Sequence, residues 1–122
     1  MDVRSNYSRL SAMQQTGDND QVWQEFYTED IVRRISGLDP LAGRDACRRQ
    51  VQDFLDGLKA PQTIEQLTLA FDDENKVSVI EYDQSFSHKT HGDITQRITM
   101  VQRWREDQIY DETIYVMRRD HD

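Results

Sequence analysis

The chain has 122 residues, of which 36% are hydrophobic and 31% charged, and these proportions predict one domain over residues 1–122 with a modest core. Its 15 lysines and arginines against 23 aspartates and glutamates give a formal net charge of -8, which argues against nucleic acid and anionic membrane surfaces as partners. No apolar run approaches the roughly 20 residues of a membrane span, and Met1–Leu10 lack the layout of a secretion signal, so we predict a cytoplasmic protein.

The N-terminal half has the apolar spacing of helices. A first helix ends at Thr16 and Gly17, and its apolar face consists of Val3, Tyr7, Leu10 and Met13. Asp18 and Gln21 resemble a capping box that starts a second short helix with the apolar residues Val22, Trp23, Phe26 and Tyr27. A third helix is predicted over residues 44–59, ahead of Pro61. The only cysteine, Cys47, lies on its apolar face and is expected in the core.

Strand signals begin with a β-branched, half-polar segment at residues 31–36, followed by a predicted loop at 37–43. Beyond Pro61 the apolar period changes to two, which predicts consecutive strands at 67–71, 77–88, 94–105 and 109–117. Short polar turns separate them. Helices followed by an antiparallel meander are typical of an α+β domain whose sheet covers its apolar face with the helices.

This order resembles the nuclear transport factor 2-like superfamily, in particular its SnoaL-like and ketosteroid-isomerase-like branches. The local sequences that carry the resemblance are Gly17-Asp18, Phe26-Tyr27-Thr28-Glu29-Asp30, Pro40-Leu41-Ala42-Gly43-Arg44 and Asp107-Gln108-Ile109. The resemblance implies a cone-shaped, curved antiparallel sheet packed on three N-terminal helices, as in cystatin-like folds. It also implies a pocket at the open end and an outer sheet face that often forms homodimers. Function in this superfamily is diverse and has to be argued from the site.

Strand alternation sorts the side chains onto two faces, and we take the face richer in large apolar residues as the concave one. That face is predicted to contain Leu67, Leu69, Phe71, Ile80, Tyr82, Gln84, Phe86, Gln96, Ile98, Met100, Gln102, Trp104, Tyr110, Glu112, Ile114 and Val116. From this set we predict ligand contacts by Tyr82, Met100, Gln102, Trp104, Tyr110 and Ile114.

Glu112 is the candidate catalytic residue, because it is a carboxylate in the middle of an apolar strand face. Burial there would raise the carboxyl pKa and suit a general acid or base, with Tyr82 and Gln102 as donors to a developing oxyanion. The competing interpretation turns Glu112 outward or pairs it with an arginine such as Arg97 or Arg103. A shift of one residue in register would exchange the two faces.

The catalytic groups of related branches do not carry over to this chain. The isomerase branch uses a tyrosine and two acids, and the matching positions here are Leu10, Ile35 and Met100, all apolar. The epoxide hydrolase branch needs an Asp-Arg-Asp cluster, for which we find no matching pocket-facing set. Many SnoaL-like chains have an aspartate near the end of the last strand, where this one has Met117, and that difference weakens a cyclase assignment.

Two other clusters have plain structural interpretations. His88, His91 and Asp93 could be drawn as metal ligands, but they fall at a turn and need not converge, so we predict no metal and no cofactor. The arginines at 33–34, 44, 48 and 49 could bind an anionic ligand, although such a run more often balances nearby acids on a solvated face.

Two functional hypotheses follow. The first is a SnoaL-like pocket protein that binds a small apolar molecule, either as a carrier or as an enzyme of acid-base type (isomerase, cyclase or lyase). The second is a noncatalytic domain for homodimerisation or partner association, and a homodimer is expected in both cases. A cavity that holds an acid would favour the first, and a filled cone would favour the second.

Overall fold

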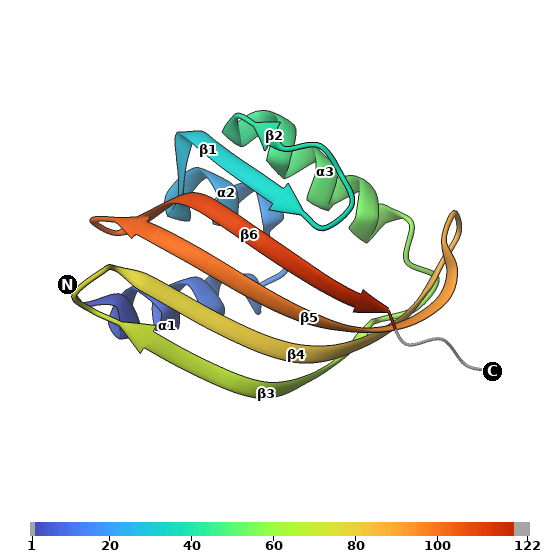
Figure 1. Cartoon of the computed structure of the whole chain (residues 1–122). Coiled ribbons are helices and arrows are strands. Elements are labelled where there is room, and N and C mark those ends of the chain that lie inside the picture. Colours follow the sequence, from blue (N-terminus) through green and yellow to red (C-terminus); the bar gives the residue numbers. More distant parts are fainter. Residues whose placement is uncertain (1, 119–122) are drawn as a thin grey trace.

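The computed structural model describes residues 2–118 and consists of three helices and a six-stranded sheet (Figure 1). The helices are α1 (Val3–Gln14), α2 (Asn19–Phe26) and α3 (Arg44–Asp56). The strands are β1 (Tyr27–Ile35), β2 (Leu41–Ala42), β3 (Thr63–Asp72), β4 (Val77–His88), β5 (Gly92–Arg105) and β6 (Gln108–Arg118). No helix among the described residues combines the length and hydropathy of a membrane-spanning segment.

The sheet has the order β2-β1-β6-β5-β4-β3, and its long strands curve over the helices (Figure 1). Strands β3 to β6 form the predicted antiparallel meander. The α+β cone expected from the sequence is therefore confirmed, with one difference: β1 lies parallel to β6, so the sheet is mixed. Local periodicity cannot reveal this pairing, because it joins the first long strand to the last one.

Several elements differ from the sequence prediction in their boundaries or in their type. Strand β1 begins at Tyr27 instead of residue 31, and residues 41–42, predicted as loop, pair with β1 as β2. Strand β3 begins at Thr63, because an edge strand needs no alternating apolar residues and this segment is almost entirely exposed. Helix α3 ends at Asp56, ahead of the predicted residue 59, and Gly57 serves as its C-cap.

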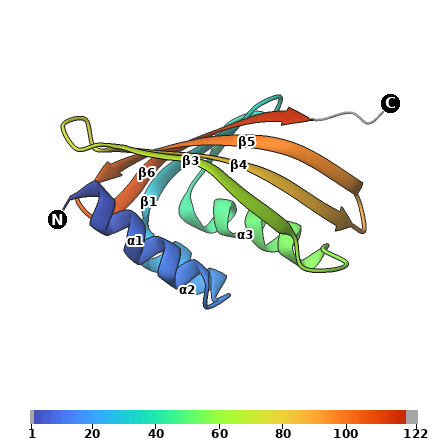
Figure 2. The ribbon, with the colours of Figure 1, turned by 90° about the horizontal axis from the view of Figure 1, so that it is seen from below.

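All three helices lie on one side of the sheet, and within residues 2–118 no element covers the outer sheet face (Figure 2). The hydrophobic core fills one end of the space between helices and sheet, and its buried members include Leu10, Trp23, Phe26, Ile31 and Ile109. Cys47 belongs to the same core and is fully buried, as expected.

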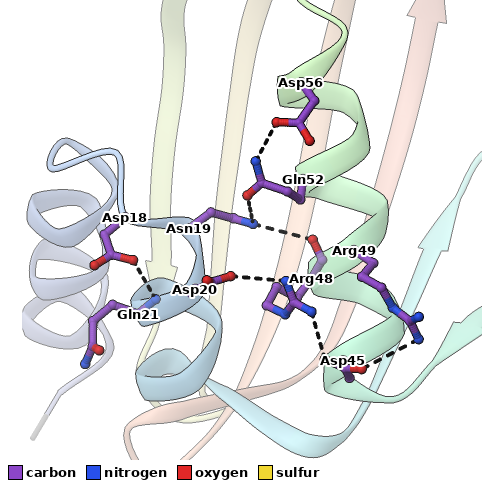
Figure 3. Close-up of polar contacts among 9 residues, drawn as sticks. All are labelled: Asp18, Asn19, Asp20, Gln21, Asp45, Arg48, Arg49, Gln52 and Asp56. Atoms are coloured by element: carbon purple, nitrogen blue, oxygen red, sulfur yellow. Dashed lines mark hydrogen bonds and ion pairs between the residues drawn. The ribbon is translucent and has the colours of Figure 1, made fainter.

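Polar contacts join the start of α2 to α3 (Figure 3). Asp18 caps α2 by accepting a hydrogen bond from the Gln21 backbone, as the sequence predicted. The Asn19 amide donates to the Gln52 side chain at 3.2 Å, and Arg48 reaches Asp20 at 3.1 Å. Most of the arginine run therefore balances acids: Arg48 and Arg49 also pair with Asp45, and Arg44 pairs with Glu29.

Candidate functional site

A cavity of about 1070 Å³ lies between the concave sheet face and the three helices. Its sheet wall is apolar at the centre, where it contains Ile80, Ile98, Met100, Ile114 and Val116. Its helical wall adds Tyr7 and Leu10 from α1 and Val51 and Phe54 from α3. Pockets of roughly 300–1,000 Å³ accommodate drug-sized molecules, so this cavity has room for one.

Glu112 lies on the concave face at one end of the cavity, only 1% exposed. Its Oε2 accepts hydrogen bonds from the Tyr27 hydroxyl at 2.9 Å and from Gln102 Nε2 at 2.8 Å. Its Oε1 accepts from Arg33 Nε at 3.0 Å, which is also an ion pair. Three donors therefore surround one buried carboxylate, and because one of them is a cation, its hydrogen bond is charge-assisted.

Further hydrogen bonds hold the groups around Glu112 in place. Gln102 accepts from the Ser78 hydroxyl at 3.2 Å, and Ser78 in turn accepts from Trp104 Nε1 at 2.9 Å. Arg33 Nη1 donates to Gln50 on α3 at 2.8 Å, which links the sheet to the helical wall. The carboxylate is thus the centre of a polar network that reaches from the core to the cavity. Each hydrogen bond in this network limits the orientations that the neighbouring side chains can adopt.

Sequence reasoning missed two members of this network, Tyr27 and Arg33. They lie 85 and 79 residues from Glu112 in the chain, and the parallel β1–β6 pairing brings them together, with Arg33 and Glu112 as register partners. The alternative that pairs Glu112 with an arginine is confirmed, but the two arginines named for it, Arg97 and Arg103, are wrong: the partner is Arg33, and Arg97 pairs with Asp83 on the outer face. Tyr27 also stacks on Trp23 with ring centroids 3.8 Å apart, which orients its hydroxyl.

Four of the predicted contact residues, Tyr82, Met100, Gln102 and Ile114, line the cavity. Trp104 does not line it, because it is buried in the core, where its indole N–H donates a hydrogen bond to Ser78. Tyr110 does not line it either. The register of β5 and β6 shifts beside Trp104, which pairs with Ile109, so Tyr110 is the extra residue of a bulge. Tyr110 instead contacts the Arg105 guanidinium.

A second irregularity removes Leu67 from the concave face. The register of β3 and β4 shifts between Gln66 and Thr68, which leaves Leu67 unpaired and 40% exposed. After the shift, Leu69 pairs with Ile80 and follows the predicted face. Each bulge inserts one residue, which interrupts the alternation of side chains between the two faces. The wrong predictions for Tyr110 and Leu67 therefore have the same origin.

Burial raises the pKa of Tyr82 to about 12, and the Glu112 charge adds to the shift. The pKa of Tyr27 is also raised, first by burial and then by the Glu112 charge. An exposed phenol releases its proton near pH 10. Both phenols are therefore neutral in the physiological range, and neither is a phenolate base.

The Tyr82 shift predicts a measurable alkaline effect. Its folded-state pKa lies above the unfolded value, so its stabilising contribution is complete below pH 10 and is lost as the pH rises through about 12. Two pKa units correspond to at most about 2.7 kcal/mol. Urea unfolding at pH 9, 10 and 11 should show a shallower decline for Tyr82→Phe than for the wild type, whereas parallel declines would contradict the burial of this phenol.

His88 and His91 lie at the cavity rim with ring centroids 4.5 Å apart. Both nitrogens of His88 are occupied: Nδ1 accepts from the Thr90 backbone N–H, and Nε2 lies 3.1 Å from the Phe54 carbonyl, to which it donates. Asp93 accepts from Ser87. Among residues 2–118, no group of three or more His, Cys, Asp or Glu is arranged to hold a metal ion.

No protein-family model matches this sequence. No curated protein matches it in sequence either. Solved structures do match: a proposed SnoaL-like polyketide cyclase from Mesorhizobium loti has a TM-score of 0.75 at 14% identity, covering 94% of this chain and 99% of its own. The chain has the SnoaL-like, nuclear transport factor 2-like fold.

Two more structures share this SnoaL-like fold. A proposed isomerase from Bacillus subtilis has a TM-score of 0.74 at 13% identity, covering 95% of this chain and 89% of its own. The epoxide hydrolase/cyclase-like enzyme SalBIII, which acts in pyran ring formation in the polyether salinomycin, has a TM-score of 0.73 at 18% identity, covering 93% and 89%. At these identities the similarity shows the fold, and the chemistry has to be inferred from the residues of the site.

Within the SnoaL-like cone, the three residues that the resemblance puts near the catalytic positions of the isomerase branch all line the cavity. Leu10, Ile35 and Met100 offer no proton-transfer group there. Arg33 lies between the Glu112 carboxylate and the Gln50 amide. An Asp-Arg-Asp cluster contains two acids, whereas Arg33 contacts one acid and one amide.

Proposed function

We propose that this chain binds a small, largely apolar molecule in the cavity of the cone, as a carrier or sensor. The observation that carries the proposal is the cavity itself: it is large, its centre is apolar, and polar groups gather at its end around Glu112. Such a combination of apolar walls and a few convergent polar groups is typical of small-molecule sites. The names of the structurally similar cyclases and isomerases are consistent with a small organic ligand.

A catalytic role for Glu112 has less support than binding. Its carboxylate is nearly inaccessible and already accepts from Tyr27, Gln102 and Arg33. A general base must reach the proton it removes, and the oxygens of this carboxylate are already engaged by these three donors. We therefore assign Glu112 the role of a buried anchor that positions Gln102 and Arg33 at the cavity end.

The proposal is tested by a thermal-shift screen of small lactones, aromatic polyketide fragments, steroids and terpenoid epoxides at pH 5.5 and pH 8. A ligand at tenfold its Kd stabilises the native state by about 1.4 kcal/mol and raises the melting temperature by several degrees. Met100→Trp, which places a bulky ring at the centre of the apolar wall where the ligand would lie, should abolish the shift. Its matched control is Thr99→Trp, on the opposite face of the same strand.

Two results would count against this function. A screen without any hit would remove its basis, and a thermal shift that persists in Met100→Trp would place the binding site elsewhere. If a hit is found, Glu112→Gln provides a test of the acid-base alternative. Turnover that is lost in Glu112→Gln while binding is retained would restore the enzyme hypothesis.

A homodimer formed through the outer sheet face is a second proposal. The helices lie on the other side of the sheet (Figure 2). On β6, Ile114 and Val116 face the cavity, so Tyr115 and Met117 lie on the outer face, where they are 56% and 66% exposed. Large apolar side chains at such exposure are typical of surfaces that a partner covers. Light scattering should give a mass about twice the 14.5 kDa of one chain, and Tyr115→Asp should halve it. A wild-type monomer would contradict the dimer.

We also propose a cytoplasmic location, supported by the free, buried thiol of Cys47, which fits a reducing compartment. The net charge of -8 continues to argue against nucleic acid as a partner. Fractionation of cells that express the tagged chain tests the location, and recovery in a membrane or secreted fraction would contradict it.

A further inference from the structure

The cavity lining is unusually rich in amides. Eight of the lining residues are glutamines, whereas only three are charged: Arg33, Asp53 and Glu112. An amide both donates and accepts hydrogen bonds and has no net charge. The polar part of this cavity is therefore suited to a ligand that is itself polar but uncharged.

Three of these glutamines form a hydrogen-bonded ladder across neighbouring strands. Gln96 Nε2 on β5 donates to Gln84 Oε1 on β4 at 2.8 Å, and Gln84 Nε2 donates to Gln62 Oε1 at 2.6 Å. Gln84, in the middle, is 8% exposed. Each amide has two N–H groups and two acceptor lone pairs, so the ladder retains capacity to bind a ligand oxygen.

The charges in the cavity cancel each other. Arg33 and Glu112 form an ion pair at 3.0 Å, and Asp53 is exposed. Among the described lining residues, a ligand carboxylate would find no arginine or lysine outside this ion pair, and the one carboxylate outside it, that of Asp53, is exposed to solvent, which screens its charge. Moving a ligand carboxylate or ammonium from water into the cavity would carry a desolvation cost without a matching charge.

The ladder is separated from the Glu112 network by an apolar stretch. Along β5 the concave face contains Gln96, Ile98, Met100 and Gln102, and six residues of strand span about 20 Å. Along β5 the cavity thus has a polar group at each end with an apolar stretch between them, and on β4 the Tyr82 ring lies beside Ile98. An elongated molecule with an oxygen near one end can place that oxygen on the ladder and its hydrocarbon against Ile98 and Met100.

We infer that the cavity selects uncharged ligands that carry a carbonyl or hydroxyl oxygen, and that the Gln62–Gln84–Gln96 ladder binds this oxygen. The inference rests on the proposed function, because it assigns a ligand class to the same cavity. It adds two elements: discrimination against charged analogues, and a specificity-determining position at Gln84.

The test uses three probes of the same bicyclic shape: 2-ethylnaphthalene, 2-acetylnaphthalene and 2-naphthoate. Affinity is measured at pH 7.5 by the fluorescence of Trp23, which lines the cavity, with Trp104→Phe as a background that removes the second indole. The ketone should bind at least tenfold more tightly than the carboxylate. Gln84→Leu should weaken ketone binding about fivefold, the equivalent of one neutral hydrogen bond, and leave ethylnaphthalene binding unchanged.

Gln24→Leu is the matched control, because Gln24 is exposed and lies outside the cavity lining. It should leave the binding of all three probes unchanged. Naphthoate binding as tight as that of the ketone would overturn the selection for uncharged ligands while leaving a binding cavity in place. Equal losses for ketone and ethylnaphthalene in Gln84→Leu would overturn the role of the ladder. If none of the three probes binds, the proposed function fails and this inference fails with it.

Discussion

Replacing Arg33 with methionine is expected to destabilise the fold by about 3–5 kcal/mol, because it leaves the Glu112 carboxylate buried without its cation. Adding Glu112→Gln to this variant should recover at least half of the loss. An amide at position 112 has no charge to compensate, and its oxygen can still accept from Tyr27 and Gln102, which contact the carboxylate in the native chain. Urea unfolding at pH 7 measures all four states of the cycle.

The control for this cycle is Arg97→Met. Arg97 forms two hydrogen bonds to Asp83, but their side chains are 31% and 26% exposed, so the loss should stay below about 1 kcal/mol. Equal costs for Arg33→Met and Arg97→Met would contradict the claim that burial makes the Glu112 pair special. Additive losses in the double variant would contradict the coupling between Arg33 and Glu112.

The second large effect is expected at Gly57, the C-cap of α3. A Cβ there would lie 2.1 Å from Nε2 of His88, a distance that no real contact tolerates. His88 cannot easily move, since both of its nitrogens are hydrogen-bonded and its ring stacks on Phe54. The Gly57 backbone is also fixed, because its carbonyl accepts from the Lys89 N–H at 2.8 Å.

Gly57→Ala should therefore lower the free energy of unfolding by about 1–3 kcal/mol, the usual cost of overpacking, with the loss of a His88 hydrogen bond in addition. The double variant Gly57→Ala/His88→Ala removes the obstructing ring, so its cost should be smaller than the sum of the two single costs. Chemical unfolding provides the values. A Gly57→Ala variant as stable as the wild type would show that His88 does not occupy this position.

Much of the fold could be predicted from local patterns. The three helices follow from apolar residues at intervals of three and four, and the Asp18 cap is visible as a short motif. The strands of the meander follow from alternation, which also placed Glu112 on the concave face. These features depend on neighbours in the chain, so the sequence displays them directly.

The composition of the site was harder to predict, because it depends on long-range pairing and on bulges. Tyr27 and Arg33 reach Glu112 only through the parallel β1–β6 ladder, which no local pattern indicates. Tyr110 was misplaced because the β5–β6 register shifts by one residue near the turn. The one local signal of the Arg33 contact is a charged residue within a β-branched strand. That signal also fits a run of arginines on a solvated face, which is the more common arrangement.

The most direct test of ligand binding in the cone is a titration with 2-acetylnaphthalene, observed through ¹³C-labelled methionine methyl groups. Met100 lines the cavity, whereas Met117 is exposed on the outer sheet face, so the two methyls report on opposite sides of the same sheet. Binding in the cone should shift the Met100 resonance and leave that of Met117 in place. A titration that shifts only Met117, or neither resonance, would contradict a ligand-binding cavity.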